Sequence, residues 1–410
     1  TVGKSGVEAA FEEYLRGKNG RRVISTNSEG KITGQYYATE PEPGSTVELT
    51  IDLELQQTVE AILAEAVTAM NKDGLTDRGA AAVVELVDSG ELLALANYPT
   101  YDLSTYRQDY TELSEDPAHP LYNRATSTPY APGSTIKPLT AVAALEEGIV
   151  SPTDKIYSPY TWRYPGDPNS YSNCAGGSHG WINVSQAITK SCNYFFSEMG
   201  YQLGMDNLRE YLSAFGLGAH TGIETGDNTG TLPENRPGED QAPWAGYGQA
   251  NQAYTPLQLA NYICTLVSGG VRREPHLLKA VKSYDNSQVL AVGNTEPVQT
   301  LELHDATLEA VKKGMYGYTQ PGGSVAAYFQ NCVVTAGAKT GTSQLGGDQK
   351  DNGVFVCFAP YDDPEIVVSI VIEHAGSGAA LAPSAVKILN AYFSADNVSG
   401  SITGENQLLP

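Results

Sequence analysis

Residues 353–374, GVFVCFAPYDDPEIVVSIVIEH, predict two buried β-strands joined by a short loop. Runs rich in Val, Ile and Phe are typical of strands, and the polar segment YDDPE interrupts the apolar pattern between them. A link this short favours antiparallel pairing, because parallel neighbours need a long crossover connection. The segment therefore predicts the centre of an antiparallel sheet.

Three further β-rich runs extend this sheet. The run CVVTAGAKTGT (332–342) precedes the two strands predicted within residues 353–374. The runs GAAAVVELV (79–87) and ELLALANYP (91–99) lie far earlier in the chain and flank an Asp-Ser-Gly turn. The long stretch between these two groups of strands has mostly helical patterns. We therefore expect an α+β fold, with one five-stranded antiparallel sheet flanked by helices and the middle of the chain inserted as a helical lobe.

Composition divides the chain into three segments. Residues 1–45 are polar and turn-rich and end in the linker-like TEPEPGS, residues 46–396 contain the predicted sheet and helices, and residues 397–410 form a polar tail. No apolar run is long enough to span a bilayer. Because the first residue is Thr1 rather than Met, we expect a fragment from which an N-terminal membrane anchor is missing.

The 410 residues carry a net charge of −22, which argues against nucleic acid and anionic membrane surfaces as partners. Five cysteines without a C-x-x-C pair leave the redox compartment undecided. Asp167, Cys174 and His179 lie in a loop-like stretch, but their spacing matches no closed zinc pattern. We therefore expect no bound metal and no other cofactor.

Three short motifs carry the residue types needed for acyl transfer. Ser134 opens the helical pattern YAPGSTIKPLTAVAALEEG, and Lys137 lies three residues later on the same helix face. A serine hydroxyl is a poor nucleophile until a base takes its proton, and a lysine can do so when burial or a nearby cation lowers its pKa. Each motif alone is weak, and a stray S-x-x-K occurs at Ser28–Lys31. The other two motifs are Ser191-Cys192-Asn193, between two helical patterns, and Lys339-Thr340-Gly341-Thr342, at the end of an edge-like strand.

Beyond these motifs, most of residues 47–394 resemble a class B penicillin-binding protein transpeptidase domain. The lead-in PLYNRA and the start GVEAAFEEYLRGKNG are most similar to the elongation (rod-shape) branch, and that start also resembles the end of a non-catalytic pedestal domain. Asn193 stands where some elongation-branch members have Asp, so a division or sporulation paralogue stays an alternative. The other segments that carry the resemblance are LTIDLELQQ, DPAHPLYNRATSTPYAPGSTIKP, SCNYFFSEMGYQLGMDNLREYLSAFGLG, GQANQAYTPLQLANY, KTGTSQ and GVFVCFAPYDDPEIVVSIVIEH.

The resemblance implies a peptidoglycan D,D-transpeptidase that forms a serine acyl-enzyme and that β-lactams inhibit covalently. Its implied partners are a D-Ala-D-Ala stem peptide as donor, a second stem peptide as amine acceptor, and a glycosyltransferase. Its implied location is the extracytoplasmic face of the bacterial membrane. The expected catalytic residues are Ser134, Lys137, Ser191 and Lys339, the expected substrate-binding residues are Asn193, Thr340, Gly341 and Thr342, and backbone N–H groups of Ser134 and Thr342 form the expected oxyanion hole.

The same motifs also occur in two rival functions, a β-lactamase and a non-enzymatic β-lactam sensor. A β-lactamase needs a residue that activates the deacylating water. We find no carboxylate in the motifs for that role, and Glu146 and Glu147 lie about three turns from Ser134 at ~1.5 Å per residue. A sensor would be acylated but would not join peptides. The pedestal-like start and the long insertions favour the synthase.

Overall fold

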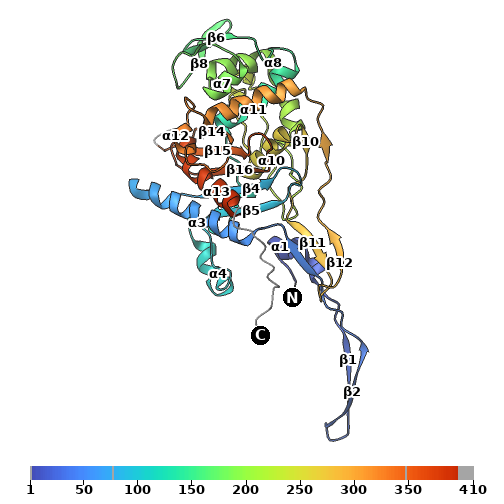
Figure 1. Ribbon diagram of the computed structural model, residues 1–410. Helices are drawn as coiled ribbons and strands as arrows, with labels where there is room; N and C mark the ends of the chain where they lie inside the picture. The colour runs from blue at the N-terminus through green and yellow to red at the C-terminus, as the bar shows by residue number, and fades with distance from the viewer. Residues whose placement is uncertain (1, 76–77, 347–348, 396–410) are drawn as a thin grey trace.

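The structure is a computed structural model that describes residues 2–75, 78–346 and 349–395. The predicted polar tail, residues 397–410, therefore lies outside the described residues. Figure 1 shows a central sheet with helices on both sides. The sheet has five strands in the order β14-β15-β16-β4-β5, and every neighbouring pair is antiparallel. The strands are β4 (Ala80–Leu86), β5 (Leu92–Tyr98), β14 (Gly337–Ser343), β15 (Asn352–Ala359) and β16 (Ile366–Ile372).

The predicted α+β fold with a five-stranded antiparallel sheet is thus confirmed. β15 and β16 pair from Gly353 opposite Ile372 to Ala359 opposite Ile366, so the predicted loop is the turn between them. Every residue of β15 and β16 is buried. Helices cover both faces of the sheet, which explains why these strands are continuously apolar rather than alternating.

Two hydrophobic clusters lie on opposite faces of the sheet, and β4 contributes to both. Ala82 and Val84 pack with α3 (Leu53–Met70) and α13 (Ala382–Ala395) on one face. Ala81 and Val83 pack on the other face with α10 (Pro256–Val267) and the lobe. Successive side chains of a strand point to opposite faces of the sheet, so a continuous run of small and β-branched residues can pack into both hydrophobic clusters. This second face carries the lobe that positions the candidate site.

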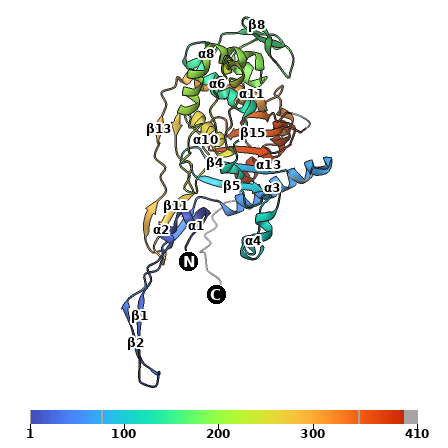
Figure 2. The same cartoon turned by 180° about the vertical axis from the view of Figure 1, so that it is seen from behind.

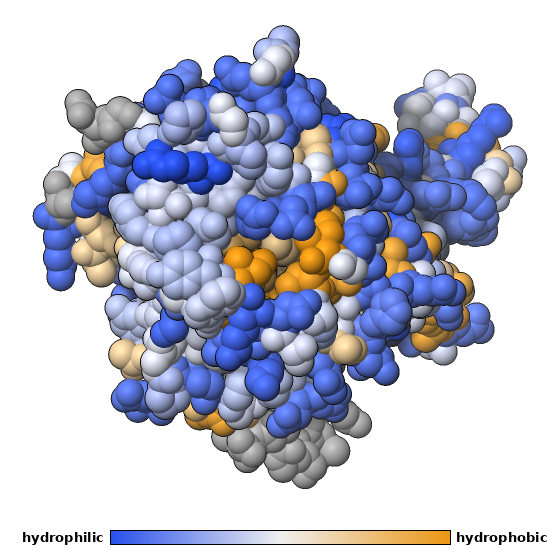
Figure 3. All heavy atoms as spheres, turned by 90° about the horizontal axis from the view of Figure 1, so that it is seen from above, coloured by the Kyte–Doolittle hydropathy of each residue, from blue (hydrophilic) through white to orange (hydrophobic). Residues whose placement is uncertain are grey.

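The middle of the chain forms the predicted lobe, at the top of Figure 1. Two small antiparallel sheets, β6 with β9 and β7 with β8, were not predicted, because their Ser-, Asn- and Tyr-rich strands lack an apolar alternation. Figure 3 views the molecule from this end and shows a largely hydrophilic face with an apolar area near its centre and smaller ones toward its edges. The lobe contains α6 (Lys137–Glu146), β6 (Ile156–Ser158), β7 (Thr161–Tyr164), β8 (Asp167–Asn173), β9 (Gly180–Ile182), α7 (Val184–Thr189), α8 (Asn193–Ala214) and α11 (Asp305–Thr319).

The N-terminal segment extends away from the sheet. The hairpin of β1 (Arg21–Thr26) and β2 (Ile32–Thr39) projects from the body, as Figures 1 and 2 show from opposite sides. β3 (Thr46–Leu49) pairs with β11 (Leu278–Lys282), which in turn pairs with β12 (Val289–Val292). The region around residues 271–300, which lacks a clear strand or helix pattern in the sequence, is therefore partly ordered as strands. Its main partner lies more than two hundred residues earlier, so no local pattern announces it.

The remaining elements complete the described chain. Within the described ranges, no helix combines the length and the apolar character needed to cross a membrane. The short strands are β10 (Val271–Arg272) and β13 (Gln299–Thr300), and the other helices are α1 (Gly6–Ala10), α2 (Glu12–Leu15), η1 (Asn71–Asp73), α4 (Tyr106–Glu115), α5 (Arg124–Ser127), η2 (Gly133–Ile136), α9 (Ala242–Ala245), α10 (Pro256–Val267), α12 (Ala326–Phe329) and η3 (Gly378–Leu381).

Candidate active site

Ser134 lies in the short helix η2, which runs directly into α6. The turn before it is held against the edge strand β14. Gly133 has φ +52°, and a Cβ at this position would lie 2.6 Å from the carbonyl oxygen of Thr342. Only glycine tolerates both this backbone conformation and this approach. The first and third motifs are thus in backbone contact.

Lys137 is the first residue of α6, and its side chain is fully buried. Its Nζ lies 2.7 Å from the backbone oxygen of Ser191, 3.1 Å from Ser191 Oγ and 2.7 Å from Asn193 Oδ1. Ser191 lies between α7 and α8, as predicted, and its φ of +51° turns the chain there. Lys137 therefore joins the first motif to the second.

Lys339 lies on β14, the predicted edge strand, and is also fully buried. Its Nζ donates to Ser191 Oγ at 2.9 Å and to the backbone oxygen of Thr340 at 3.2 Å. The same Nζ lies 4.3 Å from the centre of the Tyr318 ring, within cation–π range. Lys339 therefore joins the second motif to the third, and two amino groups converge on one hydroxyl.

Burial disfavours a charge on either amine. The pKa of Lys137 falls well below its usual value because of burial and because of the neighbouring Lys339 charge. Burial also lowers the pKa of Lys339, to about 7. Two buried cations this close repel each other, so the second proton is bound only at lower pH. The site can thus hold one neutral amine beside one charged amine near neutral pH.

The hydrogen bonding of the Ser134 hydroxyl differs from our expectation. We expected Lys137 to contact it, but among the described residues no hydrogen bond reaches the half-buried Ser134 side chain. Lys137 is instead bonded to the second motif. Catalytic hydrogen bonds are often long in an enzyme without substrate and shorten only in the complex. The structure therefore places the two residues next to each other in one helical segment without joining their side chains.

The remaining predicted residues occupy one edge of the same site. The Thr340 hydroxyl is hydrogen-bonded to the hydroxyl of Tyr318. A Cβ at Gly341 would lie 2.2 Å from the Pro132 oxygen, so the packing of β14 against the turn before Ser134 is itself a reason for glycine there. This reason is distinct from the predicted role of Gly341 in binding substrate. The Asn193 amide is bonded at both ends within the protein, since its Nδ2 donates to the backbone oxygen of Asn173 at 2.8 Å.

Tyr318, on α11, is the site residue that sequence reasoning missed. It is buried, and it contacts both Lys339 and Thr340. Tyr318 lies outside the three motifs, and an aromatic residue in an amphipathic helical pattern is normally predicted to be part of the hydrophobic core. Only the packing of α11 beside β14 shows its position.

Cys174, His179 and Cys192 form a cluster beside the second motif. One potential metal-ligating atom from each lies within 4.8 Å of the others, and the two free thiols are 3.5 Å apart. Asp167, which we had considered with them, instead accepts hydrogen bonds from the side chain of Ser170 and the backbone of Asn169. Sulfur and imidazole ligands would suit zinc chemically. The expected metal-free state stays a prediction.

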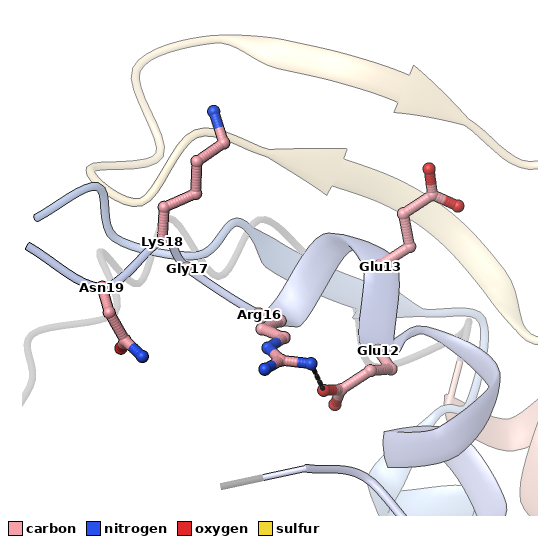
Figure 4. Close-up of a pocket in the computed structure, with 6 residues that line it drawn as sticks. All are labelled: Glu12, Glu13, Arg16, Gly17, Lys18 and Asn19. Carbon is pink, nitrogen blue, oxygen red and sulfur yellow. Dashed lines mark ion pairs between the residues drawn. The ribbon is translucent and has the colours of Figure 1, made fainter.

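A separate surface cavity of ≈510 Å³ lies in the N-terminal segment, around α2 and the residues that follow it. Figure 4 shows its charged side chains, with Arg16 directed at Glu12 in an ion pair of 3.8 Å. None of the predicted site residues lines it, so this cavity takes no part in the constellation described above.

Comparison with known proteins agrees with this geometry. Residues 80–392 match the penicillin binding protein transpeptidase domain, and residues 1–49 match the penicillin-binding protein dimerisation domain. The peptidoglycan D,D-transpeptidase MrdA of Escherichia coli K12 is 31% identical over 428 residues, which cover 97% of this chain and 65% of MrdA. The chain therefore spans 65% of the length of this curated relative.

Two solved structures share the fold. A structure described as showing the coordination of polymerization and crosslinking by a peptidoglycan synthase complex has a TM-score of 0.84 and 29% identity, and the match covers 98% of this chain and 72% of that one. Penicillin-binding protein A of M. tuberculosis, solved as an imipenem acyl-enzyme complex, has a TM-score of 0.74 and 25% identity, covering 86% of this chain and 80% of that one. From these matches, the chain belongs to the penicillin-binding protein transpeptidase family, as a class B member of the elongation branch.

Proposed function

We propose that this chain is the catalytic part of a peptidoglycan D,D-transpeptidase. It cross-links stem peptides through an acyl-enzyme on Ser134, and β-lactams acylate the same serine. The observation that carries this proposal is the convergence of Lys137 and Lys339 on Ser191 Oγ, beside the turn that holds Ser134. The name of the E. coli relative and the imipenem acyl-enzyme of the M. tuberculosis relative support it.

The hydrogen bonds of the two lysines fit opposite protonation states. A neutral Lys137 amine has two N–H groups and one lone pair. The N–H groups suit the Ser191 carbonyl and Asn193 Oδ1, and the lone pair then accepts the Ser191 hydroxyl proton. A charged Lys339 donates to Ser191 Oγ from the other side. In this arrangement Lys137 is the base, and Ser191 passes protons between the two amines.

The reaction then follows two acyl transfers. The Ser134 oxygen attacks the carbonyl carbon of the penultimate D-Ala while its proton passes to Lys137. The peptide C–N bond breaks, and D-Ala leaves with a proton delivered through Ser191. The amine of a second stem peptide then attacks the ester, an amide forms, and the proton returns to Ser134. Lys339 and the hydroxyls of Thr340 and Thr342 hold the terminal carboxylate of the donor.

The same proposal includes the domain organisation of the chain, its cellular location and its partner. Residues 1–45 are the remnant of a pedestal domain and its linker, residues 46–396 are the transpeptidase domain, and residues 397–410 are a tail. The intact protein acts on the extracytoplasmic face of the bacterial membrane, anchored by an N-terminal helix. Its partner is a glycosyltransferase, which is supported by the likeness to a synthase complex that couples polymerization to crosslinking.

Labelling with penicillin tests the proposal. Intact-mass analysis and peptide mapping should place one adduct on Ser134, and Ser134→Ala should abolish it. Ser28→Ala is a matched control, because Ser28 opens the stray S-x-x-K in the β1–β2 turn and is exposed. A mixture of donor and acceptor stem peptides should yield a cross-linked product. An adduct that persists in Ser134→Ala contradicts the site, and labelling without any cross-linked product supports the sensor instead.

A further inference from the structure

A second cavity lies in the lobe beside the candidate site. Its volume is ≈580 Å³. One wall comes from the chain around β9 and from α7, and the other comes from the segment that follows α11. The residues that line it are Gly176, Ser178, His179, Trp181, Ile182, Gln186, Lys190, Gly322 and Ser324.

Both walls of this cavity lead to catalytic motifs. Lys190 directly precedes Ser191, and its Nζ lies 3.4 Å from the Gly322 oxygen on the opposite wall. On that wall, the side chain of Ser324 hydrogen-bonds with Tyr318, which itself bonds to Thr340. The cavity is thus bounded by neighbours of the second motif on one side and of the third motif on the other.

The charge of the cavity is opposite to that of the chain. The chain has 47 acidic and 25 basic residues, yet the described lining residues of this cavity include the basic residue Lys190 and no carboxylate. Three other surface cavities all contain carboxylates, and one of them is lined by four glutamates. A cavity of this kind in an acidic protein favours an anionic ligand over a cationic one.

Its rim carries an exposed aromatic pair. Tyr157 on β6 and Trp181 on β9 lie directly opposite each other in the small sheet, with ring centroids 5.5 Å apart. Their exposed fractions are 51% and 66%. Two exposed aromatic rings in contact beside a cavity offer a ligand both a flat apolar face and a polar edge.

We propose that this cavity, with the Tyr157–Trp181 rim, binds the acceptor strand of peptidoglycan. The inference rests on the proposed transpeptidase function. The cationic cavity holds the acidic stem peptide, whose end is a free carboxylate, and the aromatic rim contacts a sugar ring of the attached glycan. The donor carboxylate is already assigned to the third motif, so this neighbouring cavity serves the second peptide.

The placement explains how the amine reaches the ester. A peptide held between Lys190 and Ser324 brings its amine beside Ser191. The amine nitrogen forms the new bond to the ester carbonyl carbon, and the bond from that carbon to Ser134 Oγ breaks. The proton lost by the amine passes through Ser191 and Lys137 to the Ser134 oxygen. No further reactant is needed.

Binding to the penicilloyl-protein tests this inference, because penicillin occupies the donor position. The probe is the uncross-linked disaccharide-pentapeptide, followed by titration calorimetry. Trp181→Ala and Lys190→Gln should each weaken binding by about tenfold or more. Tyr171→Ala is the matched control, since Tyr171 is an aromatic residue of the same lobe with 52% exposure and does not line the cavity. The affinity of the Tyr171→Ala protein for the disaccharide-pentapeptide should stay within about twofold of that of wild type.

A kinetic measurement gives a second readout. The acyl-enzyme formed from a donor peptide partitions between the amine and water, and Trp181→Ala should lower the ratio of aminolysis to hydrolysis by about tenfold. Undetectable binding by wild-type protein, equal affinity in all three variants, or an unchanged ratio would each overturn the acceptor site. Failure of the proposed function is distinct, because wild-type protein would then either take no penicillin label or yield no cross-linked product from donor and acceptor stem peptides.

Discussion

Lys137 and Lys339 approach the same atom, the hydroxyl oxygen of Ser191, from distances of 3.1 and 2.9 Å. Both side chains are fully buried, so two charges here would be strongly unfavourable. Burial and the Lys339 charge together lower the pKa of Lys137, whereas burial alone lowers that of Lys339. The site therefore assigns the neutral amine to Lys137 and the charge to Lys339.

The first prediction concerns the pH dependence of Ser134 acylation. Acylation requires Lys339 to be protonated, and its pKa is about 7, so the rate should fall as pH rises above that value. Lys339→Arg keeps its charge throughout this range, since arginine is not deprotonated in proteins. Stopped-flow measurement with a fluorescent penicillin should show the alkaline decline in wild type and none in the variant. A decline that stays in place in Lys339→Arg would contradict the assignment.

Two substitutions of Tyr318 should distinguish the role of its ring, which lies beside Lys339, from the role of its hydroxyl, which bonds to Thr340. Tyr318→Leu removes the ring beside Lys339, a contact typically worth ~0.5–2 kcal/mol, so the alkaline decline should begin at lower pH, by up to about 1.5 units. Tyr318→Phe keeps the ring but frees the Thr340 hydroxyl. It should leave the decline in place and lower the second-order acylation constant several-fold. Identical pH profiles for the two variants would argue against a cation–π role.

Lys137→Ala should slow acylation by ~10²–10⁴, which is the usual contribution of a general base. Its melting temperature should stay near that of wild type, because the loss of three hydrogen bonds is offset by the removal of a buried amine. Lys31→Ala, in the exposed stray S-x-x-K, is the control and should match wild type in both assays. Unchanged acylation in Lys137→Ala would exclude it as the base.

Acylation should not require a metal. The groups that act on Ser134 in the proposed reaction are amines and hydroxyls, and Cys174, His179 and Cys192 lie beside them rather than among them. Treatment with EDTA should therefore change neither the melting temperature nor the acylation rate. A loss of several degrees that zinc reverses would show that this cluster binds a structural metal.

The sequence could predict the strands of the sheet because they occur in two local antiparallel groups, β4 with β5 and β14 with β15 and β16. The loop 360–365 and the turn after Leu86 each specify an antiparallel pair, and burial on both faces makes the strands apolar enough to recognise. The pairing of β3 with β11 depends on contacts between distant segments, so no short pattern contains it. Local patterns thus predicted the pairs joined by short connections, whereas the pairings of β16 with β4 and of β3 with β11 join distant segments.

The candidate site shows the same difference between what local sequence predicts and what long-range packing determines. The motifs identified the three segments that meet, but not which atoms they join. Lys137 is bonded to Ser191 rather than to Ser134, because the second motif fills the space beside its amine. Tyr318 was missed because its role depends on where α11 packs, and the glycine at position 341 reflects contact with the Pro132 carbonyl. These features depend on tertiary packing that no motif encodes.

The last prediction separates a transpeptidase from a β-lactamase by the lifetime of the acyl-enzyme. A transpeptidase must keep its ester until an amine arrives, so its site should not activate water. Among the described residues, none of the hydrogen bonds of the Lys137 and Lys339 amines or the Ser191 hydroxyl involves a carboxylate. The two glutamates at the end of α6 are engaged elsewhere, Glu146 with His304 and Glu147 with Tyr211.

Hydrolysis therefore lacks a carboxylate bonded to these groups that could activate a deacylating water. The penicilloyl adduct on Ser134 should survive for many minutes to hours when its mass is followed over time. A chromogenic β-lactam should give one equivalent of product and then negligible turnover. Adding the disaccharide-pentapeptide after acylation by a donor peptide should shorten the lifetime of the peptidyl ester, because an amine then replaces water as the attacking group. Steady hydrolysis of the chromogenic β-lactam at ~1 per second or faster, a rate typical of enzymes, would establish the β-lactamase alternative in place of the synthase.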